Sequence, residues 1–138
     1  GTNRGFVFRN NTNNVAGIDA SGNGRFEGDV VAFATSDERL KNNLIQIESA
    51  IDKVMTLTGY HFEWNDKQTV YPAGMQDVGV LAQDVEKIMP DVVTTRELTG
   101  YKAVKYEKLV SLLIEAIKEQ QTLINSIQDQ INSFKLSE

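Results

Sequence analysis

The sequence contains no cysteine, one histidine and two prolines among its 138 residues. The absence of cysteine excludes disulfide bonds, a thiolate nucleophile and cysteine-based zinc sites. A single histidine excludes a multi-histidine metal site, and its neighbours Tyr60 and Trp64 favour an ordinary strand position for His61. We therefore expect no metal and no cofactor.

Positive charge is also scarce, because 14 lysines and arginines stand against 19 acidic residues and give a net charge of -5. Such a chain lacks the basic surface that attracts nucleic acids and anionic membranes. No apolar run approaches the roughly 18 residues of a membrane span, and the first residues lack the pattern of a signal peptide. We expect neither a nucleic-acid partner nor membrane insertion.

The first 35 residues are rich in glycine and asparagine. They hold six of the ten glycines, no leucine and a single isoleucine, so their helix propensity is low. The segments GFVFRN (5–10), NVAGIDASGNG (14–24) and RFEGDVVAFAT (25–35) are typical of short β-strands separated by turns. Each is too short to bury its apolar side alone, so we expect three identical chains to wind together. Residues 1–35 are predicted to be the end of a β-structured fibre stalk.

The middle of the chain combines helical and strand patterns. Apolar residues at spacings of four and three predict a helix over residues 42–57. These apolar residues are Leu40, Leu44, Ile47, Ile51 and Val54. Residues 58–65 are typical of a strand, residues 77–93 of a strand leading into a short helix that Pro90 ends, and residues 101–106 of another strand. These patterns predict a small α+β domain.

The C-terminal residues carry the most regular pattern. A heptad seam, with steps of four and three, consists of Leu113, Ile117, Gln120, Ile124, Ile127, Ile131 and Phe134. Isoleucine at both core positions favours three or four helices over two, and a single polar residue such as Gln120 commonly fixes the register. We predict a parallel trimeric coiled coil over residues 109–138. The alternative is an amphipathic helix that packs on its own domain.

Between the stalk-like and helical patterns lies FATSDERLKNNL, residues 33–44. A serine hydroxyl becomes a nucleophile when a base removes its proton, and a lysine can be that base if burial lowers its pKa. On a continuous helix Ser36 and Lys41 would point about 140° apart, so a dyad requires a non-helical segment or two chains. The alternative is a plain helix start, with Ser36 or Asp37 as the N-cap.

Three motifs together resemble a known family. They are SDERLKNNL (36–44), GVLAQDVEKIMPDVV (79–93) and VKYEKLVSLLIEAIKEQ (104–120). In this order they resemble the C-terminal intramolecular chaperone and auto-processing domain of phage tail spikes and tail fibres, the endosialidase type. The resemblance covers roughly residues 35–134. It implies a domain over residues 36–108, continued by the coiled-coil helix, that trimerises, assists folding of the β stalk before it and then cuts itself off.

The resemblance also implies where and how the cut is made. The bond would be that between Thr35 and Ser36, with Ser36 as the nucleophile and Lys41 as the general base. Each chain would cut once, as a single-turnover autocatalytic serine endopeptidase.

Three other motif residues receive structural expectations only. Asp37 and Arg39 belong to the first motif, but the sequence gives neither of them a role in the reaction. Arg39 is expected to pair with a carboxylate at a chain interface, and Gln83 is expected to be a buried polar residue.

The implied biological context is a virion tail-fibre precursor that folds as a homotrimer in the host cytoplasm. The upstream fibre or spike stalk would be its folding client, and the chaperone part would be released after cleavage. Two alternatives stay open, namely a trimerisation cap that is never cleaved and a receptor-binding tip in which residues 58–99 carry recognition.

One further motif, DASGNGR (19–25), has the first half of a calcium-binding loop. Asp19, Ser21 and Asn23 alternate as ligands would, with a glycine at the sixth place. The twelfth place is Val30, where such a loop needs a carboxylate, so we predict an ordinary turn.

Overall fold

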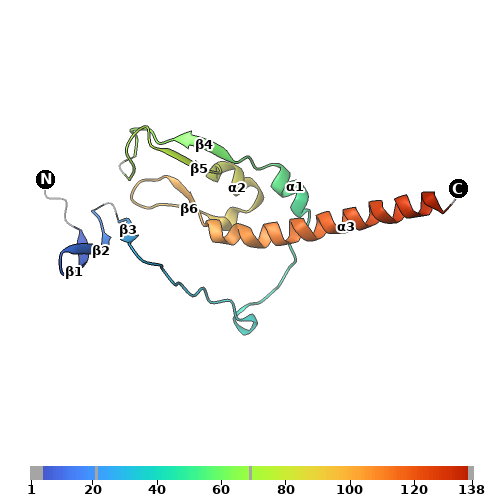
Figure 1. The fold of residues 1–138 in the computed structure, drawn as a ribbon, viewed down its shortest axis with the longest axis horizontal. Helices are drawn as coiled ribbons and strands as arrows, with labels where there is room; N and C mark the ends of the chain where they lie inside the picture. Colours follow the sequence, from blue (N-terminus) through green and yellow to red (C-terminus); the bar gives the residue numbers. More distant parts are fainter. Residues whose placement is uncertain (1–4, 21, 69, 137–138) are drawn as a thin grey trace. The chain divides into compact units, whose positions relative to one another are not determined.

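The computed structural model describes residues 5–20, 22–68 and 70–136 (Figure 1). The chain divides into two compact units, residues 1–43 with 62–77 and residues 44–61 with 78–138. The elements, in chain order, are β1 (Phe6–Asn10), β2 (Asn13–Ile18), β3 (Gly24–Phe26), the 3-10 turn η1 (Glu38–Leu40), α1 (Ala50–Met55), β4 (Tyr60–Glu63), β5 (Gln76–Gly79), α2 (Ala82–Ile88), η2 (Pro90–Val92), β6 (Val93–Thr95), β7 (Lys102–Val104), η3 (Tyr106–Lys108) and α3 (Leu109–Lys135). The predicted α+β class is confirmed, with small sheets and a long C-terminal helix.

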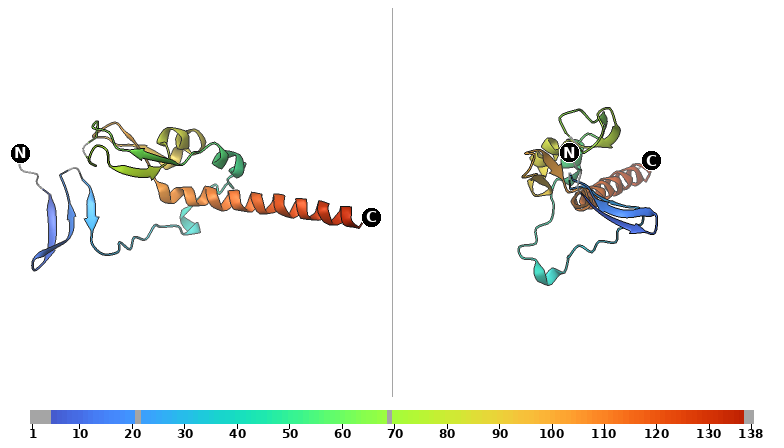
Figure 2. Two further views of the ribbon diagram at one scale, coloured as in Figure 1. Left: turned by 45° about the horizontal axis from the view of Figure 1, so that its top comes forward. Right: turned by 90° about the vertical axis from the view of Figure 1, so that its left-hand side faces the viewer.

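In the first unit, β1, β2 and β3 form an antiparallel sheet in that order (Figure 2). Phe6 lies opposite Ile18, and Ala16 lies between Phe8 on one side and Phe26 on the other. Opposed residues share a face of the sheet, so this face is apolar. Its four large side chains are 47–76% exposed, so the single chain leaves the face uncovered.

The third predicted β segment is wrong beyond Phe26, where β3 ends. Residues 29–36 belong to no helix or strand. Gly28 and Asp29 are poor strand formers, and the described part of this unit places no strand beside the residues that follow. The apolar side chains of this segment are therefore solvated, and Phe33 is 94% exposed.

The strands β4 and β5 form a two-stranded sheet, with an aromatic cluster that joins β4 to the connecting loop. Trp64 stacks on Tyr71 with 4.7 Å between ring centres and meets Phe62 edge to face at 5.1 Å. The Trp64 Nε1 group donates a hydrogen bond to Asp77 Oδ2 at 3.1 Å. The strand predicted within residues 58–65 is confirmed as β4.

In the second unit, α1, α2, the β6–β7 pair and the beginning of α3 pack around a small core. The buried hydrophobic side chains among the described residues are Ala50, Val85, Val92 and Leu112. The helix predicted before Pro90 is confirmed as α2, which ends at Ile88 because proline cannot continue it. The strand predicted within residues 101–106 is confirmed as β7.

The helix predicted over residues 42–57 is wrong over its first half, because α1 begins only at Ala50. Asn43 and Ser49 have φ values of 54° and 51°, in the left-handed region that interrupts a right-handed helix. The carboxylate of Glu119 on α3 accepts hydrogen bonds from the backbone N–H groups of Ala50 and the next residue, both at 2.9 Å. Because the first N–H groups of a helix lack partners within it, this contact fixes where α1 begins.

The Glu119 contact makes the stability of this unit depend on pH. Hydrogen bonds from the backbone of Ile51 and of Ala50 lower the pKa of Glu119 below its ordinary value of 4.5. Its contribution to stability is therefore present above the unfolded-state pKa and is lost as the pH falls through the folded-state pKa. Urea unfolding between about pH 7 and about pH 3 should show a smaller loss of stability for Glu119→Gln than for wild type.

The matched control for this experiment is Glu107→Gln, at an exposed position in η3. It should lose stability with acid as wild type does. An unchanged pH dependence in Glu119→Gln would contradict the prediction.

Candidate active site

Ser36 and Lys41 lie on either side of η1, a 3-10 helix of one turn. The backbone is extended at the N-cap Asp37 (φ -65°, ψ 131°) and extended again at Lys41 (φ -121°, ψ 138°). Two backbone hydrogen bonds close the turn, from Leu40 N to Asp37 O at 3.1 Å and from Lys41 N to Glu38 O at 3.0 Å. The alternative of a plain helix start is thus right about Asp37 as a cap, but the helix ends after one turn.

This turn brings the two predicted dyad residues into contact. Lys41 Nζ donates a hydrogen bond to Ser36 Oγ at 2.8 Å. A 3-10 turn has about three residues per turn, so two residues that flank it can meet where a continuous helix would separate them. The distance is within the reach that a general base needs to remove the hydroxyl proton. Both side chains are exposed in the single chain.

Asp37 and Arg39 form an ion pair next to this contact. The guanidinium donates to both carboxylate oxygens, from Nε to Oδ1 at 3.0 Å and from Nη2 to Oδ2 at 2.7 Å. The backbone N–H of Arg39 also donates to Oδ1, at 2.9 Å. The side-chain and backbone hydrogen bonds from Arg39 lower the pKa of Asp37. Arg39 thus contacts a carboxylate of its own chain, while its pairing at a chain interface stays a prediction.

The predicted seam residues lie along α3, a helix of 27 residues. The helix packs on its own unit through Leu112, which is 1% exposed, whereas the adjacent Leu113 is 48% exposed. The seam lies on a different face of α3 from Leu112. Each of its members is exposed in the single chain: Leu113, Ile117, Gln120, Ile124, Ile127, Ile131 and Phe134. Intramolecular packing therefore uses a different face from the seam.

Among the residues that the structure describes, no other element of this unit lies beside the C-terminal half of α3 (Figures 1 and 2). Residues 120–136 are all exposed. Of the helices that the structure describes, none combines the length and the apolar character needed to cross a membrane.

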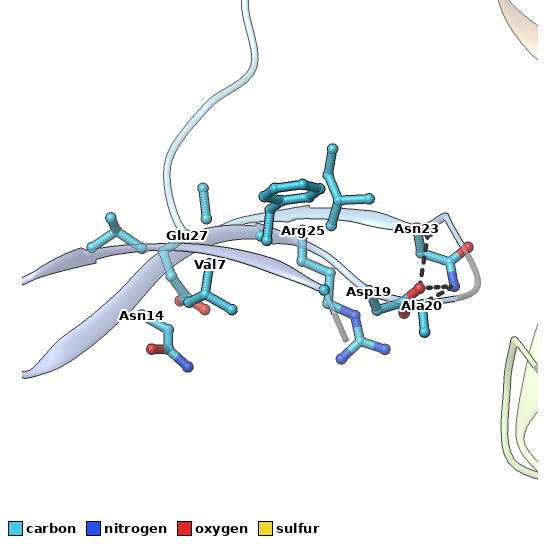
Figure 3. Close-up of a pocket in the computed structure, with 13 residues that line it drawn as sticks. Val7, Asn14, Asp19, Ala20, Asn23, Arg25 and Glu27 are labelled. Carbon is cyan, nitrogen blue, oxygen red and sulfur yellow. Dashed lines mark hydrogen bonds between the residues drawn. The ribbon is translucent and has the colours of Figure 1, made fainter. Parts of the chain in front are cut away.

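The calcium-loop candidate folds as the turn that was predicted. Asp19 Oδ1 accepts a hydrogen bond from the backbone N–H of Asn23 at 3.0 Å, beside a shallow pocket on the β1–β3 sheet (Figure 3). Ser21 lies outside the described residues. Over residues 5–20, 22–68 and 70–136, no group of three or more histidines and acidic residues is placed to hold a metal ion. Ser36 and Lys41 do not line this pocket.

Two other expected positions can be compared with the structure. His61 lies in β4, as its sequence neighbours indicated. Gln83 is exposed at the start of α2, so the expectation that it is buried is wrong in the single chain. Gln83 precedes the buried Val85 by two residues, which is about 200° of rotation around the helix.

Sequence patterns did not reveal Glu119, which acts 69 residues away from the backbone it caps. The pairing of Asp37 with Arg39 had a local signal, because opposite charges two residues apart at an N-cap can meet across one turn.

Residues 36–94 match the family model described as chaperone of endosialidase, whose short name is that of a peptidase family, Peptidase S74. The match begins at Ser36, the residue that Lys41 contacts. Residues 36–94 are thus similar to the chaperone of endosialidase family, and the resemblance drawn from the motifs is confirmed. The third motif, residues 104–120, lies beyond the matched segment.

The curated relatives are tail-fibre proteins of phages. Long tail fiber protein Gp37 of Enterobacteria phage M1 is 33% identical over 110 residues, which are 78% of this chain and 43% of the relative. The protein of the same name from Enterobacteria phage Ox2 matches to the same extent. Gp37 of Enterobacteria phage K3 is 29% identical over 105 residues, 72% of this chain but 8% of the relative. The chain thus spans less than half the length of the curated relatives it matches.

Proposed function

We propose that this chain is the intramolecular chaperone of a phage tail fibre or spike, that it works as a homotrimer, and that it releases itself by cutting its own Thr35–Ser36 bond. The observation that carries this proposal is the 2.8 Å contact between Lys41 Nζ and Ser36 Oγ, at the first residue of the family match. A serine and a lysine held in this way form the minimal pair for acyl transfer.

The proposed reaction has two steps, and its atoms balance. Lys41 Nζ takes the proton of Ser36 Oγ, which attacks the carbonyl carbon of Thr35. The peptide C–N bond breaks, the nitrogen of Ser36 receives the proton back from Lys41 Nζ, and Thr35 becomes an ester of the Ser36 hydroxyl. Water then adds to the ester, which leaves a carboxyl group on Thr35 and restores the hydroxyl of Ser36.

Assembly would supply what the single chain lacks. An amine accepts a proton only when it is uncharged, and removal from water favours the uncharged form. Lys41 is exposed in the single chain, so we infer that neighbouring chains cover it in the trimer. Cleavage would then follow assembly and not precede it.

The exposed seam of α3 supports the trimer. A long apolar stripe on a helix requires a partner surface, and the heptad spacing with isoleucine at both core positions favours three or four helices over two. Ile117 is 65% exposed and Ile124 is 51% exposed, although both would be core residues of a coiled coil.

The uncovered apolar face of the β1–β3 sheet supports a folding client at the N-terminal side. Strands this short gain stability only when further strands or chains cover them. Three copies held together by their α3 helices would bring three such faces close to each other at high local concentration. Once the chaperone is released, the folded stalk would lack its folding template. We expect this loss to raise the barrier to unfolding, which is a gain in kinetic stability.

A second function, a trimerisation cap that is never cleaved, is favoured by one observation. Both dyad side chains are exposed, and Lys41 acts as the hydrogen-bond donor in this contact. If assembly left them exposed, the pair would lack the enclosed surroundings that a lysine base requires, and the Thr35–Ser36 bond would stay whole.

Intact mass under denaturing conditions tests the proposal on freshly purified wild type, Ser36→Ala and Lys41→Ala. Wild type should give two fragments, residues 1–35 and 36–138, and both variants should remain whole because loss of either group lowers the rate by orders of magnitude. Ser126→Ala and Lys105→Ala are matched controls at exposed positions outside the dyad and should be cut normally.

Two outcomes would reject self-cleavage. Wild type that remains whole while sedimentation reports a trimer would identify the permanent cap. Fragments that also form in Ser36→Ala would point to a contaminating protease.

A further inference from the structure

The turn that joins the dyad residues is held without packing. None of the three residues of η1 is buried, and Leu40 is 71% exposed. The contacts that hold the turn are therefore local hydrogen bonds, including the one that the Asp37 carboxylate accepts from the backbone N–H of Arg39. Side-chain caps of this kind satisfy a free N–H group and favour the turned conformation.

The same carboxylate attracts Lys41 electrostatically. After the side-chain and backbone hydrogen bonds of Arg39, the charge of Lys41 is a further cause that lowers the pKa of Asp37, so Lys41 lies within electrostatic reach of this carboxylate. A lysine ammonium is a flexible point charge, and a free carboxylate attracts it more strongly than a neutral hydroxyl does.

Arg39 occupies both oxygens of Asp37 through a two-point contact, at 3.0 Å and 2.7 Å. This fork geometry is specific to guanidinium and carboxylate groups, and it leaves Lys41 Nζ to Ser36 Oγ. The ion pair itself adds little to the stability of the single chain, because the Arg39 side chain is 87% exposed.

We propose that Asp37 and Arg39 are positioning residues of the self-cleavage, in which Asp37 closes the turn and Arg39 keeps the Asp37 carboxylate from capturing Lys41. This inference rests on the proposed function. It predicts that Arg39 affects the rate of self-cleavage only while residue 37 carries a charge.

A double-mutant cycle tests this dependence, with the rate of self-cleavage measured by denaturing mass analysis from the moment of assembly. Arg39→Ala should slow cleavage about tenfold or more, because Lys41 moves to the free carboxylate. Asp37→Asn keeps an oxygen that can cap the turn but carries no charge. In that background, adding Arg39→Ala should change the rate by no more than about threefold.

The controls separate positioning from folding. Every variant should sediment as wild type does, and Arg96→Ala, which removes an exposed arginine elsewhere, should be cut at the wild-type rate. If Arg39→Ala slows cleavage equally with Asp37 and with Asn at position 37, Arg39 has another role and this inference is wrong. Cleavage at the wild-type rate in Arg39→Ala would overturn it as well. If wild type itself is never cut, the proposed function fails, and this inference fails with it.

Discussion

The full chain carrying Ile124→Asp is expected to be monomeric and to remain uncut. Ile124 lies in the middle of the seam and is 51% exposed in the single chain, so the substitution leaves the fold of its own unit intact. In a parallel trimer it would place three carboxylates around one axis, away from water, at a cost of about 3 kcal/mol or more for each chain. Sedimentation velocity measures the assembly, and denaturing mass analysis measures the cut.

The matched control for Ile124→Asp is Asn125→Asp, which adds the same charge next to the seam. Asn125 accepts a hydrogen bond from Gln121 at 2.8 Å, and an aspartate can accept it equally well. This variant should assemble and be cut as wild type is. A monomeric Ile124→Asp that still cuts itself would show that assembly and cleavage are independent, and would refute their proposed coupling.

Leu112→Ala is expected to destabilise the second unit by about 2–5 kcal/mol, the range for deleting a buried leucine side chain. Leu112 is 1% exposed and is the largest of the fully buried side chains. Its neighbour Leu113 belongs to the seam and is 48% exposed, so Leu113→Ala should lower the stability of the monomer much less. Urea unfolding in the Ile124→Asp, Ser36→Ala background measures both effects on a whole, monomeric chain.

In chains that keep Ile124 and can assemble, Leu113→Ala should affect association more than Leu112→Ala does. Leu113→Ala should weaken the trimer, which appears as a stronger dependence of sedimentation on concentration, while Leu112→Ala acts through the fold of each chain. Equal effects of the two substitutions in the monomeric background would mean that α3 does not divide its faces as described.

Most of the elements were predictable from the sequence because local patterns decide them. Pro90 ends α2, alternation marks β4, and heptad spacing marks α3. The exposed state of the seam also follows from its regularity, since a helix that packs on one small domain does not need apolar residues over so many turns.

The misjudged elements depend on contacts between distant residues or on missing ones. Apolar periodicity before Ala50 suggested a longer α1, yet its start is set by Glu119, far along the chain. The β character of residues 27–35 has no partner strand within the described chain, so extended sequence there stays unpaired.

For the site, the sequence identified Ser36 and Lys41 but left their meeting open, since a five-residue spacing is unfavourable on a helix. The single turn η1 resolves this geometry. Enclosure of the pair by other chains depends on how an assembly arranges them around η1, which the heptad pattern does not specify.

The division of α3 also affects the entropy of assembly. Beyond Glu119, residues 120–135 of α3 extend about 24 Å at 1.5 Å per residue, and all of them are exposed in the single chain. A helical segment that lacks tertiary contacts is only marginally stable in water. Ordering this half is therefore a cost that association must offset, and the association constant contains a folding equilibrium. In the proposed trimer, the affinity of the chains for one another would then be tuned by the helix propensity of solvent-facing residues such as Asn125 and Ser126, which would touch no other chain.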